Sequence, residues 1–282
     1  MTTAPESHTW AAVETARSWL FVPADRPDRF DKAVSSGADI AVLDLEDGVG
    51  PANKQAARAA AVAWFTYGGR AAVRVNEASS THHQQDVAAI AGLPGVMAVI
   101  LPMATDAGDL GELHRKVGPG IPLVAQIETA VGLFKAAELE AVDGVTRLAF
   151  GHLDFAFDVD CSPTRAALAY ARSMLVVASR VAGLAGPVDS VTTELDDSDM
   201  TIADTEYARE LGLTGKLCIH PSQVATVNAV FRPTEAHLRW AKQVAAVGAA
   251  GAARVDGQMI DAPVIARAMR IIAQSGRSID RA

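Results

Sequence analysis

The stretch PLVAQIETAVGLFKAAELE (122–140), with TRLAFGHLD (146–154) after it, shows the pattern that decides the fold. A near-continuous apolar run of strand length is followed by an Ala- and Leu-rich segment with helical spacing, and then by another apolar run. Parallel strands that are covered on both faces have such near-continuous apolar sequences. The stretch therefore predicts a strand–helix–strand unit of a parallel sheet.

The same alternation recurs along most of the chain. The apolar, strand-like runs are SWLFV (18–22), IAVLDLE (40–46), AAVRVN (71–76), VMAVILP (96–102), PLVAQIE (122–128), RLAFGHLD (147–154), PVDSVTT (187–193) and KLCIHP (216–221). Eight strand–helix repeats predict a (β/α)8, or TIM, barrel. An open, doubly wound sheet is the alternative, but the turn after the first run, PADRPDRF (23–30), lacks the G-x-G-x-x-G pattern common there.

The barrel is expected to span residues 17–233, and residues 234–282 form a separate C-terminal part. This part contains a predicted helix (234–247), a glycine-rich connector (248–259) and a last helix (262–276). A helix after a glycine-rich connector is typical of a lid, or of an arm that reaches a neighbouring subunit. A helix packed on its own barrel is the other interpretation, and the sequence does not decide between them.

Composition excludes several classes of protein. The chain has 282 residues, of which 50% are hydrophobic, and a formal net charge of −8, which argues against a nucleic-acid partner. Cys161 and Cys218 are too few for a disulfide framework, so we expect reduced thiols and a cytoplasmic location. The first residues do not resemble a signal peptide, and no apolar run reaches about 18 residues. We therefore expect no membrane partner.

Glu128 and Asp154 each lie at the expected end of a strand-like run. The carboxyl ends of barrel strands meet at one face, so these two acids are expected to lie close together. Carboxylate oxygens suit a hard divalent cation such as Mg²⁺, with Mn²⁺ as a possible substitute. Alternatively, each acid caps the helix that follows it or pairs with a nearby base.

Arg74 lies inside the otherwise apolar run AAVRVN. A buried guanidinium is costly without a partner, so it is expected to face carboxylates or an anionic ligand. The acidic segment around Asp44, Glu46 and Asp47 supplies possible partners. These acids are expected to orient Arg74 while its free edge binds a substrate carboxylate through two parallel hydrogen bonds.

Two further segments carry candidate residues. Arg26, Arg29 and Lys32 could bind phosphate groups, or they could be a solvated helix start with local Asp–Arg pairs. Asp261, just before the last predicted helix, could be an ordinary acid at a helix N-terminus. In a lid it could instead transfer a proton.

Two histidines add weaker signals. His220 could be a base or a structural residue ahead of Pro221, and His152 is a possible lining residue of the site near Asp154.

Taken in order, several motifs resemble the HpcH/HpaI aldolase/citrate lyase superfamily, and in particular its citrate lyase β-subunit-like CoA-ester lyases. These motifs are WLFVPADRPDRFDKA (19–33), VLDLEDGV (42–49), VRVN (73–76), IETAVGL (127–133), FGHLD (150–154), CIHPSQ (218–223) and DGQMIDAP (256–263). The resemblance covers about residues 17 to 275. It departs from the family pattern at His152 and Leu153, where the family often has a small residue and a glutamate.

The resemblance implies a role for each candidate residue. Glu128 and Asp154 would bind Mg²⁺, and Arg74 would bind the carboxylate of a 2-oxo acid and polarise its oxygen. The segment with Arg26, Arg29 and Lys32 would meet the nucleotide of coenzyme A. Asp261 would be the acid/base, supplied by an adjacent subunit of a homotrimer or hexamer.

The expected activity is a reversible Claisen-type cleavage of a 3-hydroxyacyl-CoA of the citramalyl-, malyl- or citryl-CoA type to acetyl-CoA and a 2-oxo acid. Three alternatives remain open. They are an aldolase that acts on free hydroxy-oxo acids with Mg²⁺, a thioesterase or malate-synthase-like activity at the same site, and a non-catalytic subunit that binds CoA.

Overall fold

The computed structural model describes residues 4–195, 197–248, 253–255 and 258–276. The chain divides into two compact units, Met1–Asn228 and Ala229–Ala282. Parts of the predicted glycine-rich connector, 249–252 and 256–257, lie outside the described residues.

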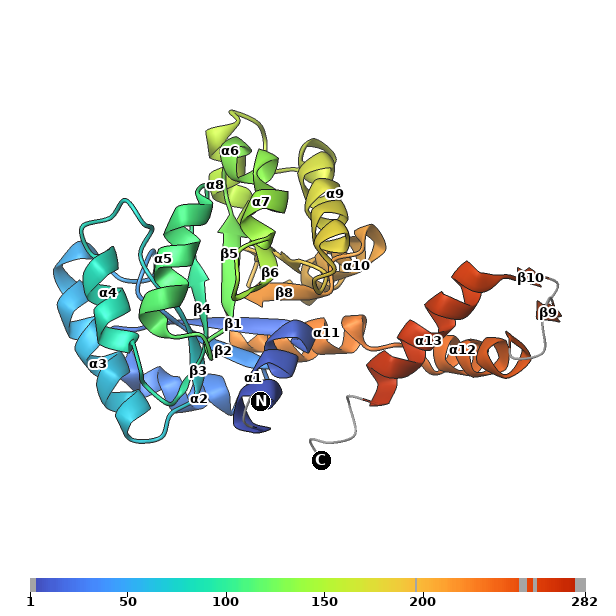
Figure 1. The fold of residues 1–282 in the computed structure, drawn as a ribbon, viewed down its shortest axis with the longest axis horizontal. Coiled ribbons are helices and arrows are strands. Elements are labelled where there is room, and N and C mark those ends of the chain that lie inside the picture. The colour runs from blue at the N-terminus through green and yellow to red at the C-terminus, as the bar shows by residue number, and fades with distance from the viewer. Residues whose placement is uncertain (1–3, 196, 249–252, 256–257, 277–282) are drawn as a thin grey trace. The chain divides into compact units, whose positions relative to one another are not determined.

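The first unit is built around a closed barrel of parallel strands (Figure 1). Neighbours in the chain are neighbours in the barrel, and the first strand pairs with the last, with Trp19 opposite Leu217. The strands are β1 (Ser18–Pro23), β2 (Ile40–Asp44), β3 (Ala71–Arg74), β4 (Val96–Leu101), β5 (Leu123–Ile127), β6 (Val145–Phe150), β7 (Val188–Asp189) and β8 (Gly215–Cys218). The predicted TIM barrel is confirmed, and the open sheet is excluded.

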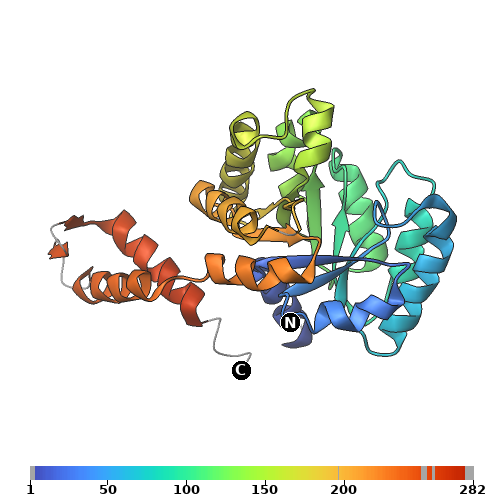
Figure 2. The same cartoon turned by 180° about the vertical axis from the view of Figure 1, so that it is seen from behind.

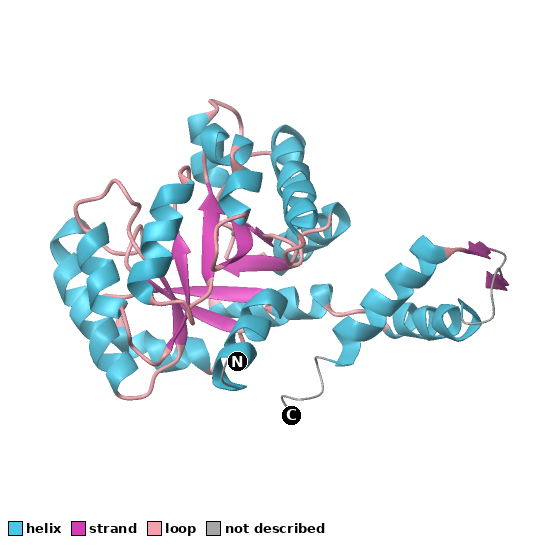
Figure 3. Cartoon of the chain, in the orientation of Figure 1, coloured by secondary structure: helices cyan, strands magenta, loops and turns pink. Residues whose placement is uncertain are grey.

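Helices surround the barrel, as Figure 2 shows from behind and Figure 3 shows by colour. They are α1 (Ala4–Thr15), η1 (Pro27–Arg29), α2 (Phe30–Val34), η2 (Pro51–Asn53), α3 (Lys54–Thr66), α4 (His83–Ile90), α5 (Ala107–Val117), α6 (Ala130–Phe134), α7 (Ala136–Glu140), α8 (His152–Asp158), α9 (Arg165–Ala182), α10 (Ser198–Leu211) and α11 (Pro221–Phe231). No helix within the described ranges is long and apolar enough to cross a membrane.

Most of the predicted strands extend beyond the strands of the structure at their carboxyl ends, and two of them do so by four residues. The run 147–154 was expected to be a strand up to Asp154, but β6 ends at Phe150 and Asp154 lies in the first turn of α8. The run 187–193 keeps only two residues as β7. The expectation that Asp154 ends a strand is therefore wrong. Gly151, in extended conformation, caps α8 and lets the chain turn from strand into helix within one residue.

The barrel interior is filled by side chains from alternate strand positions. These buried residues are Trp19, Ile40, Val42, Ala72, Ala98, Ile100, Val124, Ala149, Val188 and Leu217, and α1 adds Val13. Strands β2, β3 and β5 are buried along their whole length. Burial on both faces explains why their sequences are continuously apolar instead of alternating.

Arg147 ties the amino-terminal end of the barrel together. Its fully buried guanidinium donates to the carbonyl oxygens of Ala16 (2.6 Å) and Gly186 (2.8 Å) and to Oγ1 of Thr214 (2.8 Å). Burial lowers its pKa to about 9, because no carboxylate bonds directly to it among the described residues. The carbonyl and hydroxyl oxygens thus satisfy the hydrogen-bond donors of the buried guanidinium. Catalytic sites of such barrels lie at the opposite, carboxyl-terminal end of the strands.

The second unit consists of two helices and a small hairpin. Its elements are α12 (Glu235–Gly248), β9 (Ala253–Val255), β10 (Gln258–Ile260) and α13 (Ala262–Gly276). Ala241 and Val244 pack with Ile260 and Ala268 into a separate core. Both helices predicted for residues 234–282 are therefore present.

Glu140 is a buried acid outside the barrel mouth, at the end of α7. It is 4% exposed, and its Oε1 accepts a hydrogen bond from Oγ of Ser179 on α9 (2.5 Å). Its Oε2 has no hydrogen-bond partner among the described residues. Burial outweighs the single hydrogen bond and raises its pKa from 4.5 to about 7.

We expect Glu140→Gln to stabilise the protein selectively at high pH. Because the pKa of Glu140 is higher in the folded chain than in the unfolded one, the folded state binds more protons between pH 4.5 and 7, and stability falls as pH rises through this window. Glutamine does not titrate. The free energy of unfolding of the variant, relative to the parent, should therefore rise by about 2–3 kcal/mol between pH 5 and pH 8 in urea titrations.

The matched control is Glu138→Gln, on the exposed face of the same helix. It should shift stability equally at both pH values. A difference that does not change with pH in Glu140→Gln would contradict the raised pKa.

Candidate active site

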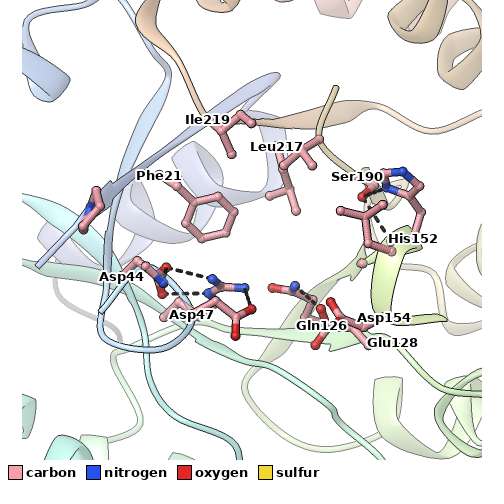
Figure 4. Close-up of a pocket in the computed structure, with 16 residues that line it drawn as sticks. Phe21, Asp44, Asp47, Gln126, Glu128, His152, Asp154, Ser190, Leu217 and Ile219 are labelled. Atoms are coloured by element: carbon pink, nitrogen blue, oxygen red, sulfur yellow. Dashed lines mark hydrogen bonds and ion pairs between the residues drawn. The ribbon is translucent and has the colours of Figure 1, made fainter. Parts of the chain in front are cut away.

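A pocket of about 350 Å³ opens among the carboxyl ends of the barrel strands (Figure 4). Its apolar lining includes Phe21, Val191, Leu217 and Ile219, and its polar lining is Asp44, Asp47, Arg74, Gln126, Glu128, His152, Asp154 and Ser190. The three residues first selected from the sequence, Arg74, Glu128 and Asp154, therefore lie together in one pocket.

Arg74 is the buried centre of an ion-pair network. Its Nε and Nη2 each donate to a carboxylate oxygen of Asp44 at 2.8 Å, and Nη1 lies 3.0 Å from Oε2 of Glu46 and 3.7 Å from Oδ2 of Asp47. The ring of Phe21 lies 4.6 Å from its guanidinium carbon. Burial alone would lower the pKa of Arg74, but the charges of Asp44, Glu46 and Asp47 outweigh it and raise that pKa.

The predicted pairing of Arg74 with the acidic segment is thus present. It is more extensive than the sequence suggested, because each of the three guanidinium nitrogens already faces a carboxylate. The bidentate edge of Arg74 that was assigned to a substrate holds Asp44 instead. A substrate carboxylate would meet only the remaining N–H groups of Nη1 and Nη2.

Glu128 follows β5 directly and is 3% exposed. Its Oε1 accepts from Nε2 of Gln126 (2.6 Å), and its Oε2 accepts from the backbone N–H of Met103 (2.8 Å). Met103 has a φ of 51°, a left-handed conformation that non-glycine residues rarely adopt, so the donor is aimed at some cost in backbone energy. Burial is the largest cause that raises the pKa of Glu128 to about 7.

Gly151 makes room for this carboxylate. A Cβ at position 151 would collide with Oε1, Cγ and Cδ of Glu128. A glycine here therefore reflects the close approach of a side chain from β5 to the turn after β6.

Asp154 reaches the same end of the pocket from the first turn of α8. Its charge is one of the causes that raise the pKa of Glu128, and Figure 4 shows the two labelled side chains next to each other. No group of three or more His, Cys, Asp or Glu side chains suited to a metal occurs within the described part of the chain. A cation here would take two protein carboxylates and complete its shell with water or substrate, as Mg²⁺ commonly does.

The electrostatics of the pocket fit a divalent cation. Its lining carries four carboxylates and one guanidinium, a formal charge of −3. Burial, with neighbouring acids, raises the pKa of Glu46 to about 8 and that of Glu128 to about 7. Glu46 and Glu128 therefore keep their protons up to a higher pH than ordinary glutamates do, and a bound cation would displace these protons.

His152 and Ser190 form a pair that the sequence did not reveal. Oγ of Ser190, just after β7, lies 2.5 Å from Nδ1 of His152 and accepts from its backbone N–H (3.1 Å). Burial, and then the charge of Arg172, lower the pKa of His152 to about 4. His152 lines the pocket as expected, although on a helix and not on a strand.

The other candidate residues lie outside the pocket lining. Arg26, Arg29 and Lys32 are exposed around η1 and α2, and Arg26 bonds to Asp28 twice at 3.0 Å. His220 pairs with Oγ of Ser222 at 2.7 Å. Asp261 belongs to the second unit, where its Oδ1 accepts from the backbone N–H of Val264 at the start of α13 (3.1 Å).

Known proteins resemble this chain over most of its length. A citrate lyase subunit beta-like protein of Mycobacterium tuberculosis is 34% identical over 269 residues, which cover 92% of this chain and 96% of that protein. A (3S)-malyl-CoA thioesterase of Cereibacter sphaeroides is 33% identical over 271 residues, covering 92% and 94%.

Among solved structures, the CitE protein of Mycobacterium tuberculosis in complex with magnesium, acetoacetate and coenzyme A matches with a TM-score of 0.82 and 33% identity. The match covers 93% of this chain and 99% of that one. The model of the HpcH/HpaI aldolase/citrate lyase family matches residues 17–221. The chain belongs to the HpcH/HpaI aldolase/citrate lyase family.

Proposed function

We propose that this protein is a carbon–carbon lyase that depends on Mg²⁺ and cleaves a 3-hydroxyacyl-CoA to acetyl-CoA and a 2-oxo acid. The observation that carries the proposal is the pocket in which Arg74, Glu128 and Asp154 converge. It is supported by a related structure that holds magnesium, acetoacetate and coenzyme A. The candidate esters are of the citramalyl-, malyl- or citryl-CoA type.

Glu128 and Asp154 are the proposed ligands of the cation, and Mn²⁺ would be accepted by the same oxygens. Bound there, Mg²⁺ would act as a Lewis acid that polarises the substrate oxygen that becomes the carbonyl. Met103 and Gln126 hold Glu128 in place. Arg74, kept charged by its acids, is proposed to add positive potential at the substrate carboxylate and oxygen.

In the proposed reaction the C2–C3 bond of the acyl group breaks as the hydroxyl gives its proton to a solvent water molecule. The electron pair moves to C2 and gives the enolate of acetyl-CoA, which then takes up a proton. We assign this proton transfer to Asp261 and place it in the site of an adjacent subunit of a homotrimer or hexamer. We assign the CoA nucleotide to the exposed cations Arg26, Arg29 and Lys32.

A thioesterase is the second candidate. The observation that favours it is the similarity to the (3S)-malyl-CoA thioesterase, whose identity of 33% is close to the 34% of the citrate lyase subunit beta-like protein. The same pocket would bind the ester, and water would cleave the C–S bond and leave the hydroxy acid intact.

The test is a mass-spectrometric product assay with purified protein and Mg²⁺. Citramalyl-CoA, malyl-CoA and citryl-CoA are offered separately, and parallel samples contain EDTA or the free hydroxy acids. We expect acetyl-CoA plus pyruvate, glyoxylate or oxaloacetate from one ester, abolished by EDTA. Free CoA with an intact hydroxy acid would identify a thioesterase, cleavage of a free acid would identify an aldolase, and no product from any sample would contradict the proposal.

Asp261→Asn should separate proton transfer from folding. Asparagine caps helices as well as aspartate does, so the contact with Val264 and the start of α13 should persist. Loss of a general acid typically costs 10²- to 10⁴-fold in rate, so kcat should fall by that factor while affinities for Mg²⁺ and CoA stay unchanged.

The matched control is Asp197→Asn, which replaces the N-cap of α10 in the same way. Its turnover should equal that of the parent. Normal turnover in Asp261→Asn would remove Asp261 from the mechanism.

A further inference from the structure

The polar lining of the pocket has few hydrogen-bond donors left for a ligand. The nitrogens of Arg74 face Asp44, Glu46 and Asp47, and Nε2 of Gln126 donates to Glu128. Asp44, Asp47, Glu128 and Asp154 are acceptors when ionised. An acyl-CoA, in contrast, brings a carbonyl oxygen that needs a donor.

The His152–Ser190 pair supplies one. Oγ of Ser190 accepts the backbone N–H of His152, and its hydroxyl proton can then be donated to Nδ1 of the same residue. The opposite assignment would leave the hydroxyl proton without an acceptor among the described residues. In the neutral imidazole the ring proton is therefore on Nε2.

Nε2 of His152 has no hydrogen-bond partner in the described part of the chain, and the residue lines the pocket. Ser190 is itself held in place. Its carbonyl oxygen accepts a hydrogen bond from Nζ of the buried Lys216 (2.6 Å), and Ser190 is only 2% exposed. The serine thus orients the ring through its contact with Nδ1 and leaves the N–H of Nε2 available for a ligand.

The position of the pair favours one acceptor on the substrate. In Figure 4 His152 and Ser190 lie on the side of the pocket away from Asp44, whose partner Arg74 is assigned to the 2-oxo acid. The apolar side chains of Leu217 and Val191 belong to the same lining and suit the acyl chain next to a thioester.

We propose that the N–H of Nε2 of His152 donates a hydrogen bond to the thioester carbonyl oxygen of the acyl-CoA, and that Ser190 is the positioning residue that fixes this tautomer. The inference rests on the proposed function and adds a residue that selects acyl thioesters over free CoA. The same donor stabilises the oxygen of the enolate, where negative charge develops during cleavage.

The decisive experiment compares the affinities of acetyl-CoA and free CoA for the parent and for His152→Ala, by calorimetry with saturating Mg²⁺. Only acetyl-CoA has the carbonyl oxygen. We expect its affinity to fall about 3- to 10-fold in the variant, the usual effect of one hydrogen bond, while the affinity for CoA stays unchanged. The kcat/KM for ester cleavage should fall about 100-fold, because the enolate oxygen is charged.

Two further variants test the positioning role. Ser190→Ala should lower the acetyl-CoA affinity by a smaller factor, and ¹⁵N NMR of His152 should show a mixture of tautomers. Ser190→Thr keeps the hydroxyl and should restore both. His237→Ala, on the exposed surface of α12, is the control histidine and should change neither affinity.

The outcomes separate this inference from the proposed lyase activity. Equal losses for acetyl-CoA and CoA, or no loss for either, in His152→Ala would overturn the role of His152 even if the parent cleaves esters normally. If the parent cleaves no ester, but His152→Ala lowers the affinity for acetyl-CoA and not for CoA, the proposed lyase activity is refuted and the role of His152 as a hydrogen-bond donor is supported. Mg²⁺ affinity that falls with His152→Ala would show damage to the cation site and would also overturn it.

Discussion

The ion pair between Arg74 and Asp44 is the interaction around which the pocket is organised. Removing one partner of such a buried pair typically costs about 3–5 kcal/mol, because the other charge is left uncompensated. The same aspartate also accepts the backbone N–H groups of Glu46 and Gly48, and so shapes the loop that brings Glu46 and Asp47 to Arg74. One guanidinium thereby fixes the loop after β2 and the end of β3.

This pair sets the electrostatic character of the site. The guanidinium is shared among three acids, so its charge only partly offsets that of Glu128, and the lining keeps a formal charge of −3. An anionic substrate would be repelled from such a pocket until a cation is bound. We propose that a divalent cation binds to these acids first and offsets two of the three negative charges before an anionic substrate enters.

Much of this arrangement could be predicted from the sequence. Eight continuous apolar runs predict a parallel barrel, and the barrel brings the residues at strand ends together, which places Arg74 and Glu128 in one pocket. Asp154 also lies in the pocket, but on a helix and not at the end of a strand as the sequence pattern predicts. Gly151 ends β6 early, and a helical turn carries the carboxylate back toward Glu128.

The polar shell could not be predicted, because it depends on tertiary hydrogen bonds. Nothing in the sequence near Met103 indicates a left-handed residue that donates to Glu128, and Ser190 lies 38 positions from its partner His152. Gly151 was the one sequence feature that could have indicated this packing, since a glycine at the end of a strand often marks the close approach of another side chain, here that of Glu128.

The most direct test of this charge balance is calorimetric titration of pyruvate into the protein, with Mg²⁺ and with EDTA. If the carboxylate-rich pocket requires a cation before it accepts an anion, pyruvate will bind with Mg²⁺ and show no measurable heat of binding with EDTA. Equal affinity in both samples would mean that Arg74 alone holds the carboxylate, and would contradict the role assigned to Glu128 and Asp154.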